Sequence, residues 1–137
     1  MFTEITTLNG ALQLIRTATI IRFRPTFGSY EPTKATVVTY ANQILYSADK
    51  PEKIASNIGN KLSIAKLSTP NKLSLYIDAA KVIDIAEPIP EHHHPRARSV
   101  IRLIGRNPAI RAQLRETVKQ ARSKIDKALD QPDVAQA

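Results

Sequence analysis

The chain has 137 residues, of which 42% are hydrophobic and 23% are charged, and its formal net charge is +8 at pH 7. This length and composition are typical of one globular domain and exclude a chain that is disordered throughout. The absence of cysteine excludes disulfide bonds and thiolate metal sites. The apolar stretch at residues 17–21 is too short for a membrane span or a secretory signal, so we expect a soluble, cytoplasmic protein.

The positive charge is concentrated in the last third of the chain. Residues 94–137 hold ten Arg and Lys against four Asp and Glu, whereas residues 1–93 hold ten basic and eight acidic side chains. Three prolines at residues 88–95 predict a linker or a corner, because proline lacks an N–H and disfavours helix in the residue before it. We therefore expect an α+β body at 1–90 and a basic helical C-terminal segment at 91–137 that packs on the same domain.

The first part of the chain predicts a mixture of helix and strand. Apolar spacing at 8–15 favours a short helix, although Asn9-Gly10 predicts a break within it. Residues 18–24 and 35–40 are rich in β-branched side chains and predict two antiparallel strands joined by a loop at 25–34. The second strand could extend through Tyr46.

Residues 47–59 carry the signals of a helix, with Pro51 and Glu52 in its first turn and Gly59 at its end. The segments 61–68 and 72–78 predict a β-hairpin, and 82–86 a further strand. In the second arm of the hairpin, the side chains expected to point inward are Leu73, Leu75 and Ile77. Lys-Leu-Ser occurs at residues 61 and 72, but two short matches do not indicate a repeat.

The end of the chain predicts two helices. The first spans 95–104, although residues 99–104 are also compatible with a strand. The second begins with Asn107 as cap and Pro108 in its first turn, and continues to Pro132. Its apolar positions are Ile110, Leu114, Val118, Ala121, Ile125 and Leu129. The predicted fold class is α+β: an antiparallel sheet of about four to five strands, a short helix and a long basic C-terminal amphipathic helix.

Four cations form a stripe on the predicted C-terminal helix: Arg111, Arg115, Lys119 and Arg122. At about 100° per residue they fill an arc of about 80° beside an apolar arc of about 100°. Their mutual repulsion would be relieved by an external polyanion. We therefore expect a small non-enzymatic nucleic-acid-binding protein, for DNA or RNA, that needs no cofactor or metal. Including the cations upstream of the stripe, the residues expected to contact phosphates are Arg98, Arg102, Arg106, Arg111, Arg115, Lys119 and Arg122.

Other interpretations of the same helix remain open. The stripe is also compatible with a solvated surface, an acidic protein partner or a helix-turn-helix motif with 95–104 as its first helix. A membrane partner is not expected, because the apolar arc lacks aromatic side chains. The main alternative is a structural or assembly subunit, of a virion or a multiprotein complex. Such a homo-oligomer would associate through Ile110, Leu114, Val118, Ile125 and Leu129.

Three smaller patterns suggest chemistry without defining a site. Aromatic residues next to cations on predicted strands could stack on the bases of a single strand; these are Tyr76 near Lys72, and Tyr40 and Phe23 near Arg22 and Arg24. Adjacent histidines in the tract His92–His94 point to opposite sides of an extended chain, so no metal site is predicted there. Asp78 and Asp84 have the composition of a nuclease carboxylate pair but lack an accompanying acid–Lys pattern, so no catalytic residues are predicted.

Overall fold

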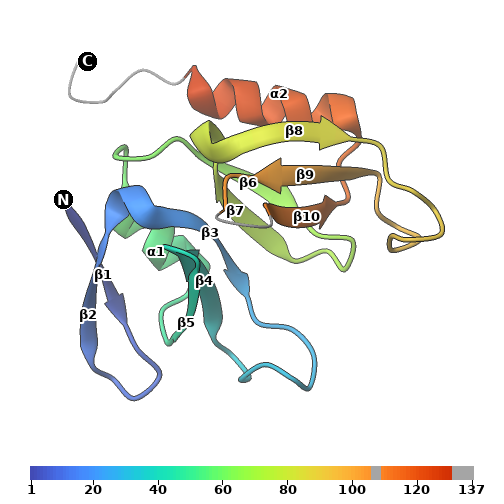
Figure 1. Ribbon diagram of the computed structural model, residues 1–137. Helices are drawn as coiled ribbons and strands as arrows, with labels where there is room; N and C mark the ends of the chain where they lie inside the picture. The colour runs from blue at the N-terminus through green and yellow to red at the C-terminus, as the bar shows by residue number, and fades with distance from the viewer. Residues whose placement is uncertain (106–108, 131–137) are drawn as a thin grey trace.

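The computed structural model describes residues 1–105 and 109–130 (Figure 1). Within these residues it contains ten strands, two α-helices and two short 3₁₀ turns. In chain order they are β1 (Phe2–Thr6), β2 (Leu12–Arg16), η1 (Thr17–Thr19), β3 (Ile20–Pro25), β4 (Thr36–Tyr40), β5 (Gln43–Ser47), α1 (Pro51–Ile58), β6 (Ile64–Ser68), β7 (Ser74–Asp78), η2 (Ala79–Lys81), β8 (Val82–Ala86), β9 (Ser99–Leu103), β10 (Ile110–Leu114) and α2 (Val118–Leu129).

All strand pairs are antiparallel, and they form three sheets. The order in the largest sheet is β5-β4-β3-β7-β6, while β10-β9-β8 and β1-β2 form smaller ones. In Figure 1 the β1-β2 hairpin lies at one side of the molecule, and α2 covers the three-stranded sheet at the other. The predicted α+β class is confirmed, with more strands than expected. Neither described helix is long and apolar enough to cross a membrane.

The chain folds as two copies of one unit. Each half has the order strand, strand, 3₁₀ turn, three strands and a helix. From β1 to β3 the counterparts in the second half lie 62 positions later, as in Phe2 and Ile64 or Ile20 and Val82. Longer loops in the second half raise this spacing to 67 at the helices, which begin at Pro51 and Val118. The structure therefore contains an internal repeat that the sequence analysis did not detect.

Backbone hydrogen bonds recur at equivalent positions of the two halves. In both, a strand irregularity falls just after the 3₁₀ turn, between Ile20 and Arg22 and between Val82 and Asp84. The bond from Thr7 N–H to Ala11 O (2.8 Å) recurs as Thr69 N–H to Leu73 O (2.9 Å). The bond from Ala41 N–H to Thr19 O (3.1 Å) recurs as Ile104 N–H to Lys81 O (2.8 Å). The bond from Ala48 N–H to Thr6 O (2.9 Å) recurs as Arg115 N–H to Ser68 O (2.8 Å). The last pair joins the final strand of each half back to its first strand.

A buried acid secures this closure in each half. The Asp49 carboxylate accepts the N–H of Thr6 at 2.8 Å, and that of Glu116 accepts the N–H of Ser68 at 3.0 Å. The backbone carbonyls of the same acids accept the hydroxyls of Thr36 (2.6 Å) and Ser99 (2.7 Å). Each carboxylate accepts a partly buried backbone N–H for which no strand partner is present in the described part of the chain, and leaving that N–H without an acceptor would cost stability.

The helix predicted at 95–104 is wrong, and the predicted long basic helix is wrong in its first part. Residues 99–103 form β9, as in the alternative strand interpretation of 99–104, and residues 110–114 form β10, which pairs with β9. The helix α2 begins only at Val118, where Thr117 and Gln120 form a reciprocal capping box. The predicted start of the helix at Asn107 and Pro108 lies outside the described residues.

Two other expectations near the start of the chain are corrected. The segment 8–15 is not a helix but part of the β1-β2 hairpin, with Gly10 in its turn at φ +86°. The single strand expected to reach Tyr46 is instead two strands separated by a turn at Ala41 and Asn42. Both turn residues have positive φ (+45° and +60°), as in the two-residue turns that match strand twist. The predicted helix α1 and the β6-β7 hairpin are confirmed.

Each half has its own hydrophobic core, but each core includes a side chain from the other half. Ile21 of β3 packs in the second core, and Tyr76 of β7 packs in the first. Tyr76, which lies on the face of β7 opposite to the inward positions Leu75 and Ile77, is also buried and stacks on Phe23 with ring centroids 4.9 Å apart. The strand β7 is therefore buried on both faces because it lies between the halves.

Replacing Ile21 by Ala tests whether a side chain of the first half stabilises the core of the second half. We expect the free energy of unfolding to fall by about 2–5 kcal/mol, the usual cost of truncating a buried isoleucine. Amides of β9 and β10 should exchange hydrogen faster, although the substitution lies in β3. Denaturant unfolding and hydrogen exchange measure these effects. Ile44→Ala, at an exposed position of β5, is the control; faster exchange confined to the first half would contradict the interpretation.

Candidate functional site

The structure separates the four cations of the predicted stripe. Arg111 lies on β10 and Arg115 precedes α2, so only Lys119 and Arg122 belong to the helix. Both helical cations are exposed, and Arg122 pairs with Asp126 at 3.5 Å. The four residues therefore do not form one continuous cationic edge.

The other predicted contact residues also lie in different places. Arg102 is on β9 and forms a bidentate ion pair with Asp84, which lowers the pKa of that carboxyl and raises the pKa of the guanidinium. Arg98 lies beside Arg115 in a hollow of about 420 Å³ at the start of α2. That hollow also contains Glu116, which pairs with Lys124 at 2.7 Å. Arg106 lies outside the described residues.

The apolar positions expected to join copies of the chain are largely used within it. Leu114 and Ile125 are buried in the second core, and Ile110 packs against that core from the edge. Leu129 is exposed at the end of α2. Since the central side chains are covered by this chain's own strands, they do not form an open surface for a second copy.

Three arginines from the two halves line a groove between the halves. We call it the junction groove; its volume is about 500 Å³. Arg22 and Arg24 reach it from β3 of the first half, and Arg111 reaches it from β10 of the second. The remaining lining is formed by Thr69, Pro70, Asn71, Leu75, His92, His93, His94, Val100, Ala112 and Gln113. No carboxylate of the described chain is part of this lining.

Arg22 lines the junction groove and is held by a hydrogen bond to the second half. It is half-buried, and its Nη1 donates to the backbone oxygen of Arg111 at 3.0 Å, which ties the two halves together. Burial lowers the pKa of Arg22 below its ordinary value, and repulsion by Arg24 lowers it further. A guanidinium nevertheless stays charged in proteins. No ion pair to Arg22 or Arg111 occurs among the described residues.

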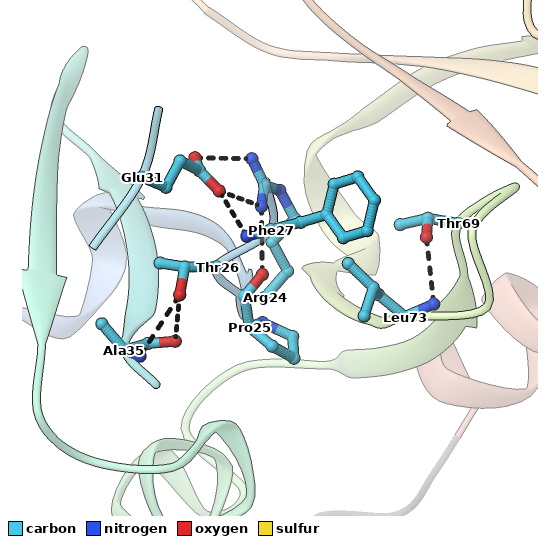
Figure 2. A network of polar contacts seen from close by, with 8 residues as sticks. All are labelled: Arg24, Pro25, Thr26, Phe27, Glu31, Ala35, Thr69 and Leu73. Atoms are coloured by element: carbon cyan, nitrogen blue, oxygen red, sulfur yellow. Dashed lines mark hydrogen bonds and ion pairs between the residues drawn. The ribbon is translucent and has the colours of Figure 1, made fainter. Parts of the chain in front are cut away.

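Arg24 is fixed by a partner in the loop that follows β3. Its two terminal nitrogens donate to the two Glu31 oxygens at 2.9 and 3.0 Å, and Glu31 also accepts the N–H of Phe27 at 2.8 Å (Figure 2). Chiefly because of the bond from Arg24, the pKa of Glu31 lies below its ordinary value. The pair fixes the Arg24 side chain and shapes the loop at 26–35.

Two exposed aromatic side chains lie on this loop, and the sequence analysis did not single them out. Phe27 and Tyr30 are both exposed, and Figure 2 shows the Phe27 ring pointing toward the turn that carries Thr69 and Leu73. By contrast, the expected stacking residues Phe23 and Tyr76 are buried against each other. The signal that could have found Phe27 is its position in a loop rich in Gly and Pro beside Arg24.

The histidine tract His92–His94 lines the junction groove. The Nδ1 atoms of His93 and His94 accept the backbone N–H groups of Ile89 (2.8 Å) and Arg96 (3.0 Å). These bonds place the proton of each neutral ring on Nε2, which can donate to a ligand. The described residues contain no group of three or more His, Asp or Glu arranged to hold a metal ion.

The two aspartates considered as a nuclease pair have separate roles. Asp78 is buried, pairs with Lys81 at 2.8 Å and accepts the N–H of Ala80 at the start of η2. Asp84 is held by Arg102 on the outer face of the three-stranded sheet. Since each carboxylate has its own cationic partner, the structure does not bring them together as a site.

Comparison with known proteins gives no match to this chain among family models, curated proteins or solved structures. The function must therefore be inferred from the chain's own side chains.

The ion pair between Arg24 and Glu31 predicts a pH dependence of stability. Because the folded pKa of Glu31 is lowered, its stabilisation is present above the ordinary value near 4.5 and is lost as the pH falls through the folded value. Glu31→Gln should therefore unfold more easily than the wild type at neutral pH, by about 1 kcal/mol. The difference should disappear in acid, as measured by denaturant unfolding at several pH values. Glu87→Gln, which removes an exposed carboxylate, is the control; a difference that persists unchanged in acid would contradict the assignment.

Proposed function

We propose that this protein binds single-stranded nucleic acid in the junction groove, with phosphates held by Arg22, Arg24 and Arg111. The observation that carries the proposal is the convergence of three guanidinium groups from two halves of the chain on a groove whose described lining contains no carboxylate. Guanidinium groups match phosphate oxygens in geometry as well as in charge. The protein is proposed as a binding protein rather than an enzyme.

The electrostatics of the groove favour an anionic ligand. Half-buried Arg22 has no ion pair among the described side chains, Glu31 balances Arg24, and exposed Arg111 has no ion pair but lies close enough to Asp84 to help lower the pKa of that carboxyl. Burial of an uncompensated cation costs free energy, which an incoming phosphate would recover. The neutral donors Asn71, Gln113 and the histidine Nε2 atoms add hydrogen bonds without adding repulsion.

The exposed aromatic rings favour a single strand over a duplex. Phe27 is linked to the groove through the Glu31 carboxylate that also holds Arg24. An unpaired base can stack on such a ring, whereas bases in a duplex are already stacked. The loop at 26–35 would therefore contact bases while the groove holds the backbone.

Charge reversal at Arg111 tests the phosphate contacts. Wild-type affinity for a short single strand should fall with salt, with a log–log slope of about −2 if three phosphates are neutralised. Arg111→Glu should weaken binding by about tenfold or more and make the slope shallower by about 1. Fluorescence anisotropy at several salt concentrations measures both.

The matched control is Lys119→Glu, which makes the same change of charge at an exposed site on α2. It should alter affinity far less than Arg111→Glu. Equal losses in the two variants would show that net charge, rather than the junction groove, determines binding.

Truncation at Phe27 tests the contribution of stacking. Phe27→Ala removes an exposed ring, so it should leave the unfolding midpoint nearly unchanged. Affinity for a single strand should fall by about 1–3 kcal/mol, while weak binding to a duplex of the same sequence should not change. Tyr46→Ala, at a half-buried aromatic of β5, is a control for loss of a ring elsewhere. An equal loss for both forms of nucleic acid would contradict a base contact.

A further inference from the structure

We propose that the chain assembles head to tail with further copies of itself, by antiparallel pairing of β8 in one copy with β2 in the next. This pairing would repeat, between chains, the contact that joins β3 to β7 within one chain. The proposal is independent of the proposed nucleic-acid binding.

The internal contact between the halves leaves two complementary edges unused. It joins the third strand of the first half, β3, to the second strand of the second half, β7. The second strand of the first half and the third strand of the second half therefore each lack such a partner. Within the described residues, β2 pairs only with β1, and β8 pairs only with β9. Figure 1 shows these two strands on well-separated parts of the molecule.

Side chains that are buried at the internal contact have exposed counterparts at these two edges. Ile21 on β3 is 6% exposed in the second core, whereas its counterpart on β8, Ile83, is 50% exposed. Tyr76 on β7 is 6% exposed, whereas its counterpart on β2, Leu14, is 53% exposed. Each unpaired edge thus exposes an apolar side chain at the position that is buried in its counterpart, where β3 pairs with β7.

The backbone and neighbouring positions support the same pairing. Phe23, opposite Tyr76, is fully buried, while its counterpart Ile85 on β8 is only half-buried. The strand irregularity of β3 recurs in β8 at the equivalent place, so both strands have the same local shape. By analogy with the internal register, Ile85 would lie opposite Leu14.

These observations select a second copy of the chain as the partner. Exposed strand edges pair readily with other strands, and here the matching edge is present on the same molecule. A contact between two different surfaces leaves one edge of each kind free at the ends of the assembly, so it produces closed rings or open chains, depending on the rotation between copies. The net charge of +8 opposes association at low ionic strength, so the assembly should strengthen as salt is raised.

Analytical ultracentrifugation of the full chain without nucleic acid tests the proposal. At moderate salt, the average mass of the wild type should rise with protein concentration beyond that of two chains. Ile83→Lys and Leu14→Lys should each sediment as a single chain, because each places a charge in one of the two edges. Ile83→Thr and Leu14→Thr, which retain strand propensity, should weaken assembly in the same direction and guard against misfolding of the lysine variants.

Mixing the two lysine variants gives the decisive measurement. Ile83→Lys retains an intact β2 edge and Leu14→Lys an intact β8 edge, so the mixture should form a complex of one chain of each and nothing larger. Ile44→Lys, at an exposed isoleucine of β5, should assemble like the wild type. A wild type that remains monomeric at every concentration, assembly that survives both substitutions, or a mixture that stays monomeric would each overturn the proposal.

Discussion

The antiparallel contact between β3 and β7 is the interaction on which the rest of the structure depends. It places Phe23 against Tyr76 and carries Ile21 into the second core, so neither core is complete without the other half. Lys81 strengthens the contact by donating to the carbonyl of Ile20 at 2.6 Å while pairing with Asp78. The same contact forms the junction groove, because it brings the cations of β3 next to β10. It is also asymmetric, and therefore leaves β2 and β8 with one edge unpaired in the part of the chain that the structure describes.

Elements with a strong local signal could be predicted from the sequence, whereas those decided by distant pairing could not. Pro51 and Gly59 correctly bound α1, and alternation correctly predicted β7. The apolar residues Ile110 and Leu114 are four apart, which suits a helix, but with Ala112 between them they also alternate as in a strand. The pairing of residues 110–114 with β9 decides between these patterns, and that contact is not visible in local periodicity.

The repeat and the candidate site were missed for related reasons. Equivalent positions of the two halves conserve a structural role more often than a residue: Asp49 and Glu116 close their halves with different side chains, and Gly10 and Lys72 occupy the same positive-φ turn position. The charge count correctly found that Arg111 lies in a cation-rich segment. It could not find Arg22 and Arg24, because they come from the balanced part of the chain and reach the groove only through folding.

Head-to-tail assembly would change how the protein binds a long nucleic acid. At a contact between chains, Asp84 would occupy the place that Arg22 has within a chain, and Asp84 is already paired with Arg102. A contact between chains therefore would not create a second cationic groove, and an assembly would carry one groove per copy at a regular spacing. Sites linked in this way bind a continuous polyanion by multivalency, since each occupied groove raises the effective concentration of the next segment of the strand. Modest affinity in a single groove would then suffice for stable binding along a long strand, while a short oligonucleotide would dissociate readily.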